Sequence, residues 1–141
     1  MRCWDIQPLK SVGKIKFGNC LADVCRIYGD EFKAFYRSPM SYNPECDFES
    51  HNFCIHLTQD EYVQGIWVYH PEQAYFQGIQ LLNRDMYELQ NELHAEGYEF
   101  QFVDDMDGLI HIELGIGITM YEGVSRSVEV FNTRMHWYEK I

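Results

Sequence analysis

The chain has 141 residues, 46% of them apolar and 16% aromatic, which suits one hydrophobic core and excludes a disordered chain. Eleven basic and 22 acidic residues give a net charge of −11, and this charge repels phosphate backbones, so nucleic acid is not an expected partner. No apolar run approaches the roughly 18–20 residues that span a bilayer. The first residues also lack a secretion signal, so we expect one cytoplasmic domain over residues 1–141.

A short helix is predicted after Gly18, with Asn19 as its N-cap and Gly29 at its end. The residues of its inner face follow helical spacing, and they are Leu21, Val24, Cys25 and Tyr28.

Strands are predicted next, at residues 32–36, 53–57 and 62–69, because apolar and polar side chains alternate there. The last of these is expected to bulge at Gly65. Residues 37–50 contain two prolines and several polar side chains, so they are expected to form a loop.

A second helix is predicted after Asn83, which can cap it, and it ends near Gly97. Its inner face is formed by Met86, Leu89, Gln90 and Leu93. An acidic hairpin turn at residues 104–108 and short strands at 98–103, 109–113, 117–121 and 127–131 complete the chain.

These elements predict an α+β fold, with an antiparallel sheet of short strands and hairpins and two short helices. Both halves of the chain read as a lead-in strand, a capped helix, a glycine and then hairpins. This order suggests a tandem helix-plus-hairpin repeat over about residues 12–75 and 76–141, with chance similarity as the alternative.

No motif for catalysis or metal binding is found in the sequence, so we expect a protein that is not an enzyme and holds no cofactor. The densest group of metal-ligating residue types consists of Cys46, His51, Cys54 and His56, and it lacks the close pairs that zinc sites use. A pocket holding His56 or His111 beside a carboxylate would instead favour a small enzyme or a ligand-binding domain.

Charge and aromatic content favour protein binding. Residues 1–40 carry seven Lys/Arg and four Asp/Glu, a net of +3, whereas residues 41–141 carry four and 18, a net of −14. An acidic surface attracts basic partners, and aromatic side chains anchor protein interfaces. We therefore expect the binding face on residues 41–141, away from the basic first 40. Seven residues are the candidate contacts: Asp60, Glu61, Trp67, Tyr69, Asp104, Asp105 and Asp107.

The alternation of side chains along the predicted strand 62–69 predicts where Trp67 and Tyr69 point. If Ile66 and Val68 pack inward, then Trp67 and Tyr69 point outward on the opposite face of the sheet.

The segment from Val12 to Gly18, with Leu21, Val24 and Tyr28-Gly29 after it, resembles the helix opening of β-lactamase-inhibitor-protein-like domains. Asn19-Cys20 stands where those domains carry Met-Thr. The resemblance implies a tandem fold that presents a sheet surface to a partner.

In size, acidity and aromatic content the chain also resembles the immunity proteins of bacterial toxins, including contact-dependent growth inhibition systems. This resemblance implies a non-catalytic inhibitor that binds a basic toxin domain, most often a nuclease, through an acidic surface that mimics phosphate charge. The alternatives are a small enzyme or ligand-binding domain, and a subunit of a larger assembly in which the aromatic residues form a self-interface.

Overall fold

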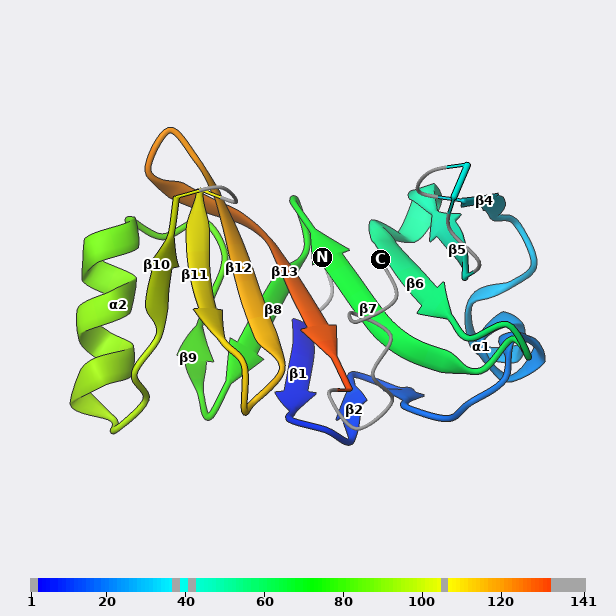
Figure 1. Cartoon of the computed structure of the whole chain (residues 1–141), viewed down its shortest axis with the longest axis horizontal. Helices are drawn as coiled ribbons and strands as arrows, with labels where there is room; N and C mark the ends of the chain where they lie inside the picture. Colours follow the sequence, from blue (N-terminus) through cyan, green and yellow to red (C-terminus); the bar gives the residue numbers. More distant parts are fainter. Residues whose placement is uncertain (1–2, 37–38, 41–42, 105–106, 133–141) are drawn as a thin grey trace.

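The computed structural model describes residues 3–36, 39–40, 43–104 and 107–132. Within these residues the chain forms two α-helices, one short 3₁₀ helix at Glu49–His51, and 13 strands in two sheets (Figure 1). The predicted α+β class is confirmed.

The larger sheet has eight strands, and every neighbouring pair in it is antiparallel. Its strands, in spatial order, are β10 (Gln101–Val103), β11 (Gly108–His111), β12 (Ile116–Tyr121), β13 (Val124–Phe131), β7 (Val63–Tyr69), β6 (Phe53–Leu57), β5 (Pro44–Phe48) and β4 (Lys33–Tyr36).

The smaller sheet has five strands and lies behind the larger one in Figure 1. In spatial order they are β3 (Ile15–Lys16), β2 (Ser11–Val12), β1 (Cys3–Gln7), β8 (Gln73–Phe76) and β9 (Ile79–Gln80). Its central pair, β1 and β8, is parallel, whereas the sequence predicted a single antiparallel sheet. The strands that precede the two helices thus form a sheet of their own, joined through the pair β1–β8.

Each half of the chain places short strands, a helix and a four-stranded antiparallel meander in the same order, with three short strands (β1–β3) in the first half and two (β8–β9) in the second. The helices are α1 (Leu21–Tyr28) and α2 (Met86–Ala95), and they stand at opposite ends of the molecule (Figure 1). The last strands of the two meanders, β7 and β13, pair with each other and join the halves into one sheet. Descent of the two halves from one duplicated unit stays a prediction.

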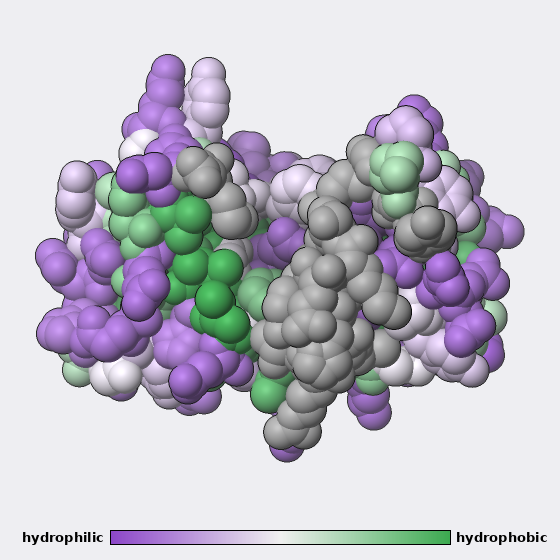
Figure 2. Space-filling model, in the orientation of Figure 1, coloured by the Kyte–Doolittle hydropathy of each residue, from purple (hydrophilic) through white to green (hydrophobic). Residues whose placement is uncertain are grey.

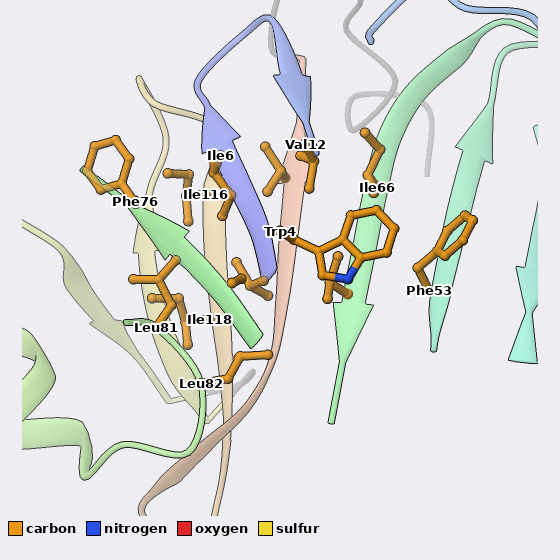
Figure 3. Packing of buried hydrophobic residues seen from close by; sticks show 14 of the residues in the cluster. Trp4, Ile6, Val12, Phe53, Ile66, Phe76, Leu81, Leu82, Ile116 and Ile118 are labelled. Atoms are coloured by element: carbon orange, nitrogen blue, oxygen red, sulfur yellow. The ribbon is translucent and has the colours of Figure 1, made fainter. Parts of the chain in front are cut away.

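The core lies between the two sheets. Ile66 and Val68 of β7 and Val128 and Val130 of β13 are at most 1% exposed, and they point toward the smaller sheet. Figure 3 shows side chains of both sheets meeting there, with Trp4 between the strands. Burial of this apolar surface is the main favourable term that holds the sheets together.

Trp4 is the largest side chain in this core and is 1% exposed. Its ring stacks on Tyr28 of α1 at 5.6 Å between centroids and packs on Phe53 of β6 at 5.2 Å. The indole Nε1–H donates a hydrogen bond to Glu72 Oε1 at 3.1 Å. Trp4 therefore connects the smaller sheet, a helix and the larger sheet, and its one polar group has a partner, as buried polar groups require.

Both helices begin one or two residues later than predicted. The N-cap of α1 is Cys20, whose backbone N–H donates to Asp23 Oδ2 at 3.0 Å, while Asn19 Oδ1 accepts from Lys16 N at 2.9 Å. The N-cap of α2 is Asp85, whose carboxylate accepts from Glu88 N at 3.1 Å. The predicted caps were wrong because aspartate carboxylates, from Asp23 in α1 and Asp85 in α2, accept from the backbone N–H groups at these helix starts.

The segment 37–50 is not only a loop, because β5 occupies residues 44–48 and pairs with both β4 and β6. The bulge predicted at Gly65 lies one residue earlier. His56 pairs with Gly65 and Leu57 pairs with Val63, so Gln64 is the extra residue of β7.

Replacing the central core residue, Trp4→Ala, is expected to destabilise the fold by about 3–5 kcal/mol, because a large buried ring and its contacts are lost. Chemical denaturation followed by far-UV circular dichroism measures this change. Tyr87→Ala is the control, since Tyr87 is 69% exposed on α2 and its loss should change stability by less than about 0.5 kcal/mol. Equal stabilities of the two variants would contradict the central role of Trp4.

Candidate protein-binding face

The larger sheet has a second face that points away from the core, and we call it the outer face. One lateral row of residues on it crosses all eight strands, because the pairing registers are continuous. From β4 to β10 this row consists of Lys33, Asp47, Cys54, Trp67, Glu129, Gly117, Ile110 and Gln101.

Trp67 and Tyr69 both lie on the outer face, as the alternation of β7 predicted. Ile66, which precedes Trp67, and Val68, which lies between Trp67 and Tyr69, are buried. Trp67 and Tyr69 are only half-buried. Trp67 is therefore near the centre of the sheet, with Cys54 opposite it on β6 and Glu129 opposite it on β13.

A cleft of about 430 Å³ opens on the outer face around these aromatic rings. We call it the aromatic cleft. Phe35 of β4, 41% exposed, adds a third ring to it. Its lining consists of Phe35, Asp47, Cys54, Trp67, Tyr69, His70, Arg126 and Ser127.

Asp47 and Tyr69 form the polar contact of the aromatic cleft. The Tyr69 hydroxyl donates a hydrogen bond to Asp47 Oδ1 at 2.8 Å. Burial raises the pKa of the Tyr69 phenol, and the bond to the Asp47 carboxylate raises it further, since both disfavour the phenolate. The phenol therefore stays neutral and holds the carboxylate in position.

A bulge places Arg126 at the edge of the cleft. Thr119 pairs with Ser127 and Met120 pairs with Ser125, so Arg126 is the extra residue of β13. Bulges redirect side chains, and here the redirected side chain lines the aromatic cleft.

The outer face of the second half is aliphatic. Figure 2 shows hydrophobic surface over β11 and β12. Ile112 is 60% exposed, and Ile110 pairs with Gly117, which has no side chain to cover it. The two halves of the outer face thus differ, with aromatic rings and carboxylates on one half and aliphatic side chains on the other.

The seven predicted contact residues do not form one cluster. Asp60 and Glu61 lie in the turn before β7, at the end of the sheet opposite Tyr69. The distance along β7 is about 20 Å, at roughly 3.3 Å per residue. The extended strand β7 therefore separates these two acids from Tyr69.

Asp104 and Asp107 lie in the turn between β10 and β11, while Asp105 lies outside the described residues. This turn is at the same end of the sheet as Tyr69, because a row of paired residues leads from Tyr69 through Ser127 to Val103. Four strand spacings of about 4.8 Å put the turn about 19 Å to the side.

The sequence did not single out Phe35 and Asp47. Asp47 falls within the segment predicted as a loop, and Phe35 belongs to the basic first 40 residues, which we expected away from the binding face. Lys16 lies on the smaller sheet, whereas β4 brings Lys33 and Phe35 onto the outer face. The sequence feature that could have predicted β5 is the spacing of Cys46 and Phe48, two apolar residues two positions apart that are both buried.

The proposed catalytic alternative required a histidine beside a carboxylate. His56 Nδ1 lies 3.5 Å from Glu45 Oε1, and their side chains are only 6% and 2% exposed. This pair is buried and thus withdrawn from solvent. His111 uses Nδ1 to accept a hydrogen bond from Leu114 N at 3.2 Å, and its ring packs edge-on against Phe100.

The Cys/His group noted in the sequence is divided between the two faces of the sheet. Cys46 points into the core, where burial raises the pKa of its thiol to about 11, and Cys54 and His56 lie on the outer face. Among the residues that the structure describes, no group of three or more His, Cys, Asp or Glu is placed to hold a metal ion.

No family model, curated protein or solved structure matches this chain. In the described part of the chain, neither helix is long and apolar enough to cross a membrane. The functional argument therefore rests on the geometry of the outer face.

The Tyr69 phenol is expected to titrate well above the exposed tyrosines when absorbance at 295 nm is followed with pH. A pKa raised in the folded state stabilises the fold fully below the unfolded value of about 10, and this contribution is lost as pH rises through the folded pKa. Tyr69→Phe should abolish that loss in urea unfolding above pH 10, whereas Tyr87→Phe should retain it. Titration of Tyr69 together with the exposed tyrosines would contradict its buried contact with Asp47.

Proposed function

We propose that this chain is a non-catalytic inhibitor that binds another protein through the outer face of its larger sheet. The observation that carries the proposal is the aromatic cleft on the outer face, where the rings of Phe35, Trp67 and Tyr69 lie beside Asp47. Half-buried Trp and Tyr side chains are the residues that most often dominate binding energy at protein interfaces.

The anatomy of the outer face supports an interface. Its centre holds the rings of Phe35, Trp67 and Tyr69, and the aliphatic patch around Ile110 and Ile112 continues the apolar surface. Protein interfaces combine such a centre with a polar rim. The acidic turns at Asp60-Glu61 and Asp104–Asp107 would belong to that rim.

The charge of the chain supports a basic partner. A net charge of −11 speeds encounter with a positively charged protein and disfavours acidic ones. Together with the size and aromatic content of the chain, this favours an immunity protein that neutralises a bacterial toxin in the cytoplasm. A nuclease is the proposed toxin, because its substrate cleft is basic.

Two other functions remain as alternatives to an inhibitor, and each is favoured by a feature of the structure. The features that favour an enzyme or ligand-binding domain are the buried Glu45–His56 pair and a second cleft of about 310 Å³, which His111 lines together with Glu99 and Glu113. Burial of the His56 ring leaves neither of its nitrogens exposed to a substrate. Self-association through the outer face is the other. Size-exclusion chromatography with light scattering separates it from the proposal, because a monomer excludes a stable self-interface.

The proposal is tested by capturing proteins from the native cells on the immobilised full chain and comparing wild type with Trp67→Ala. The true partner is retained by the wild type and reduced with the variant. Loss of this anchor is expected to weaken binding by about 2 kcal/mol, which corresponds to about a 30-fold rise in Kd. Tyr87→Ala on α2 is the matched aromatic control. A partner that binds the Trp67→Ala and Tyr87→Ala variants with the same Kd would exclude the outer face as the binding surface.

The role of the rim is tested by reversing two charges in the turn, Asp104→Lys with Asp107→Lys. Rim charges act on encounter, so we expect the association rate to fall and its dependence on salt to weaken, with little change in the dissociation rate. Surface plasmon resonance with the captured partner measures both rates. An unchanged association rate and affinity would remove this turn from the interface.

Neutralisation is measured separately from binding. If the partner is toxic when expressed alone, co-expression of this chain should restore growth, and co-expression of the Trp67→Ala variant should restore it less. A partner that is harmless alone, or rescue that is independent of Trp67, would contradict the immunity role.

A further inference from the structure

We propose that the aromatic cleft binds the guanidinium group of an arginine side chain presented by the partner. The inference rests on the proposed function and names the chemistry of the partner's central contact.

The walls of the cleft suit a flat cation. Trp67 and Phe35 both line the cleft, and Phe35 is 41% exposed, so a guest in the cleft meets aromatic side chains. A cation over an aromatic face is attracted by the ring quadrupole, most strongly for Trp, and the attraction grows as the site loses water. A cleft of about 430 Å³ is large enough to admit one arginine side chain.

Asp47 supplies the anion. Its Oδ1 accepts from the Tyr69 hydroxyl, and a carboxylate has lone pairs for several donors, so Oδ2 can accept from a guanidinium. A neutral donor such as Tyr69 orients the carboxylate without cancelling its charge. The guest would then stack on a ring and form a charge-assisted hydrogen bond at the same time.

Charges around Asp47 favour a cation at this end of the cleft. A shallow depression beside the cleft shares Asp47 and is lined by Glu31, Phe32, Lys33, Asp47, Glu49 and Ser50. Lys33 is the single basic residue in that lining and lies 3.6 Å from Glu49. Three carboxylates therefore face one ammonium group, and the local field attracts a positive side chain.

Arg126 opposes a cation at the other end of the cleft. It comes from β13, three strands away from Asp47 on β5, which is about 14 Å at 4.8 Å per strand. The cleft is thus polar along its length, and a cationic guest is directed to the Asp47 end. The negative charge of Asp47 and the positive charge of Arg126 therefore orient a charged guest along the cleft.

The shape of the site favours arginine over lysine. A guanidinium is planar, weakly hydrated and stacks on aromatic faces while its N–H groups bind a carboxylate, whereas an ammonium group is compact and strongly hydrated. Simple attraction of charge would not distinguish the two.

The experiment titrates the ¹⁵N-labelled full chain with the peptide Ac-Gly-Arg-Gly-NH₂ and follows the backbone amides of Cys54 and Ser127 on the cleft lining. Two matched peptides replace arginine with citrulline, which keeps the shape without the charge, or with lysine. We expect saturable shifts with the arginine peptide and about three- to tenfold weaker binding of the other two, as one cation–π contact implies.

Two variants locate the site. Trp67→Leu removes the ring, and Asp47→Asn removes the charge but keeps an oxygen that accepts from Tyr69. Each should weaken binding of the arginine peptide by about threefold or more. Tyr87→Leu on α2 and Asp5→Asn on β1 are the controls, since both residues are exposed and lie outside the cleft.

Equal affinity for the arginine and citrulline peptides, or for the arginine and lysine peptides, would overturn the inference. So would unchanged binding by the Trp67 and Asp47 variants. A chain that captures a partner through Trp67 but ignores the arginine peptide refutes this inference alone. A chain that binds the peptide in the cleft but captures no Trp67-dependent partner refutes the proposed function.

Discussion

The pairing of β7 with β13 is the constraint on which the rest of the structure depends. Ile66 and Val68 stand opposite Val130 and Val128, so four β-branched side chains enter the core from the two central strands. A slip of one residue would exchange the faces, moving these side chains to solvent and Trp67 into the core. The register that builds the core therefore also creates the outer face.

The smaller sheet fixes which face is covered. Its apolar side chains, including Trp4, Ile6 and Val12, fill the space against the larger sheet, and α1 and α2 add their own buried residues. The largest part of the hydrophobic burial therefore lies on that side of the larger sheet. On the outer face, the irregularity at Arg126 shows how a local bulge redirects a side chain without disturbing Val128 or Val130.

Much of this fold could be predicted from the sequence, because its elements are marked by local patterns. Helix faces and most strands of the larger sheet follow from side-chain periodicity, and the outward direction of Trp67 and Tyr69 follows from the alternation of β7 alone. The parallel pair β1–β8 could not be predicted, because it joins residues about 70 positions apart through short strands that have little pattern of their own.

The candidate site was predictable in kind but not in extent. Trp67 and Tyr69 were found because they lie on a well-patterned strand. Asp47 was missed because β5 begins at Pro44, shortly after Pro39, and its strand conformation is fixed by pairing with β4 and β6 more than by its own sequence. A cleft built from five neighbouring strands is a property of register, which no local pattern encodes.

The separation of the acidic turns from the aromatic cleft has a physical consequence under the proposed function. Charges about 20 Å from the anchor lie beyond the Debye length of about 8 Å at physiological salt, so they act little on a residue already bound at Trp67. They do act on the approach of a partner, since the chain's field extends from all of them together. Under the proposed function, the turns at Asp60-Glu61 and Asp104–Asp107 would govern encounter, while Trp67, Tyr69 and Asp47 would govern how long the complex lasts.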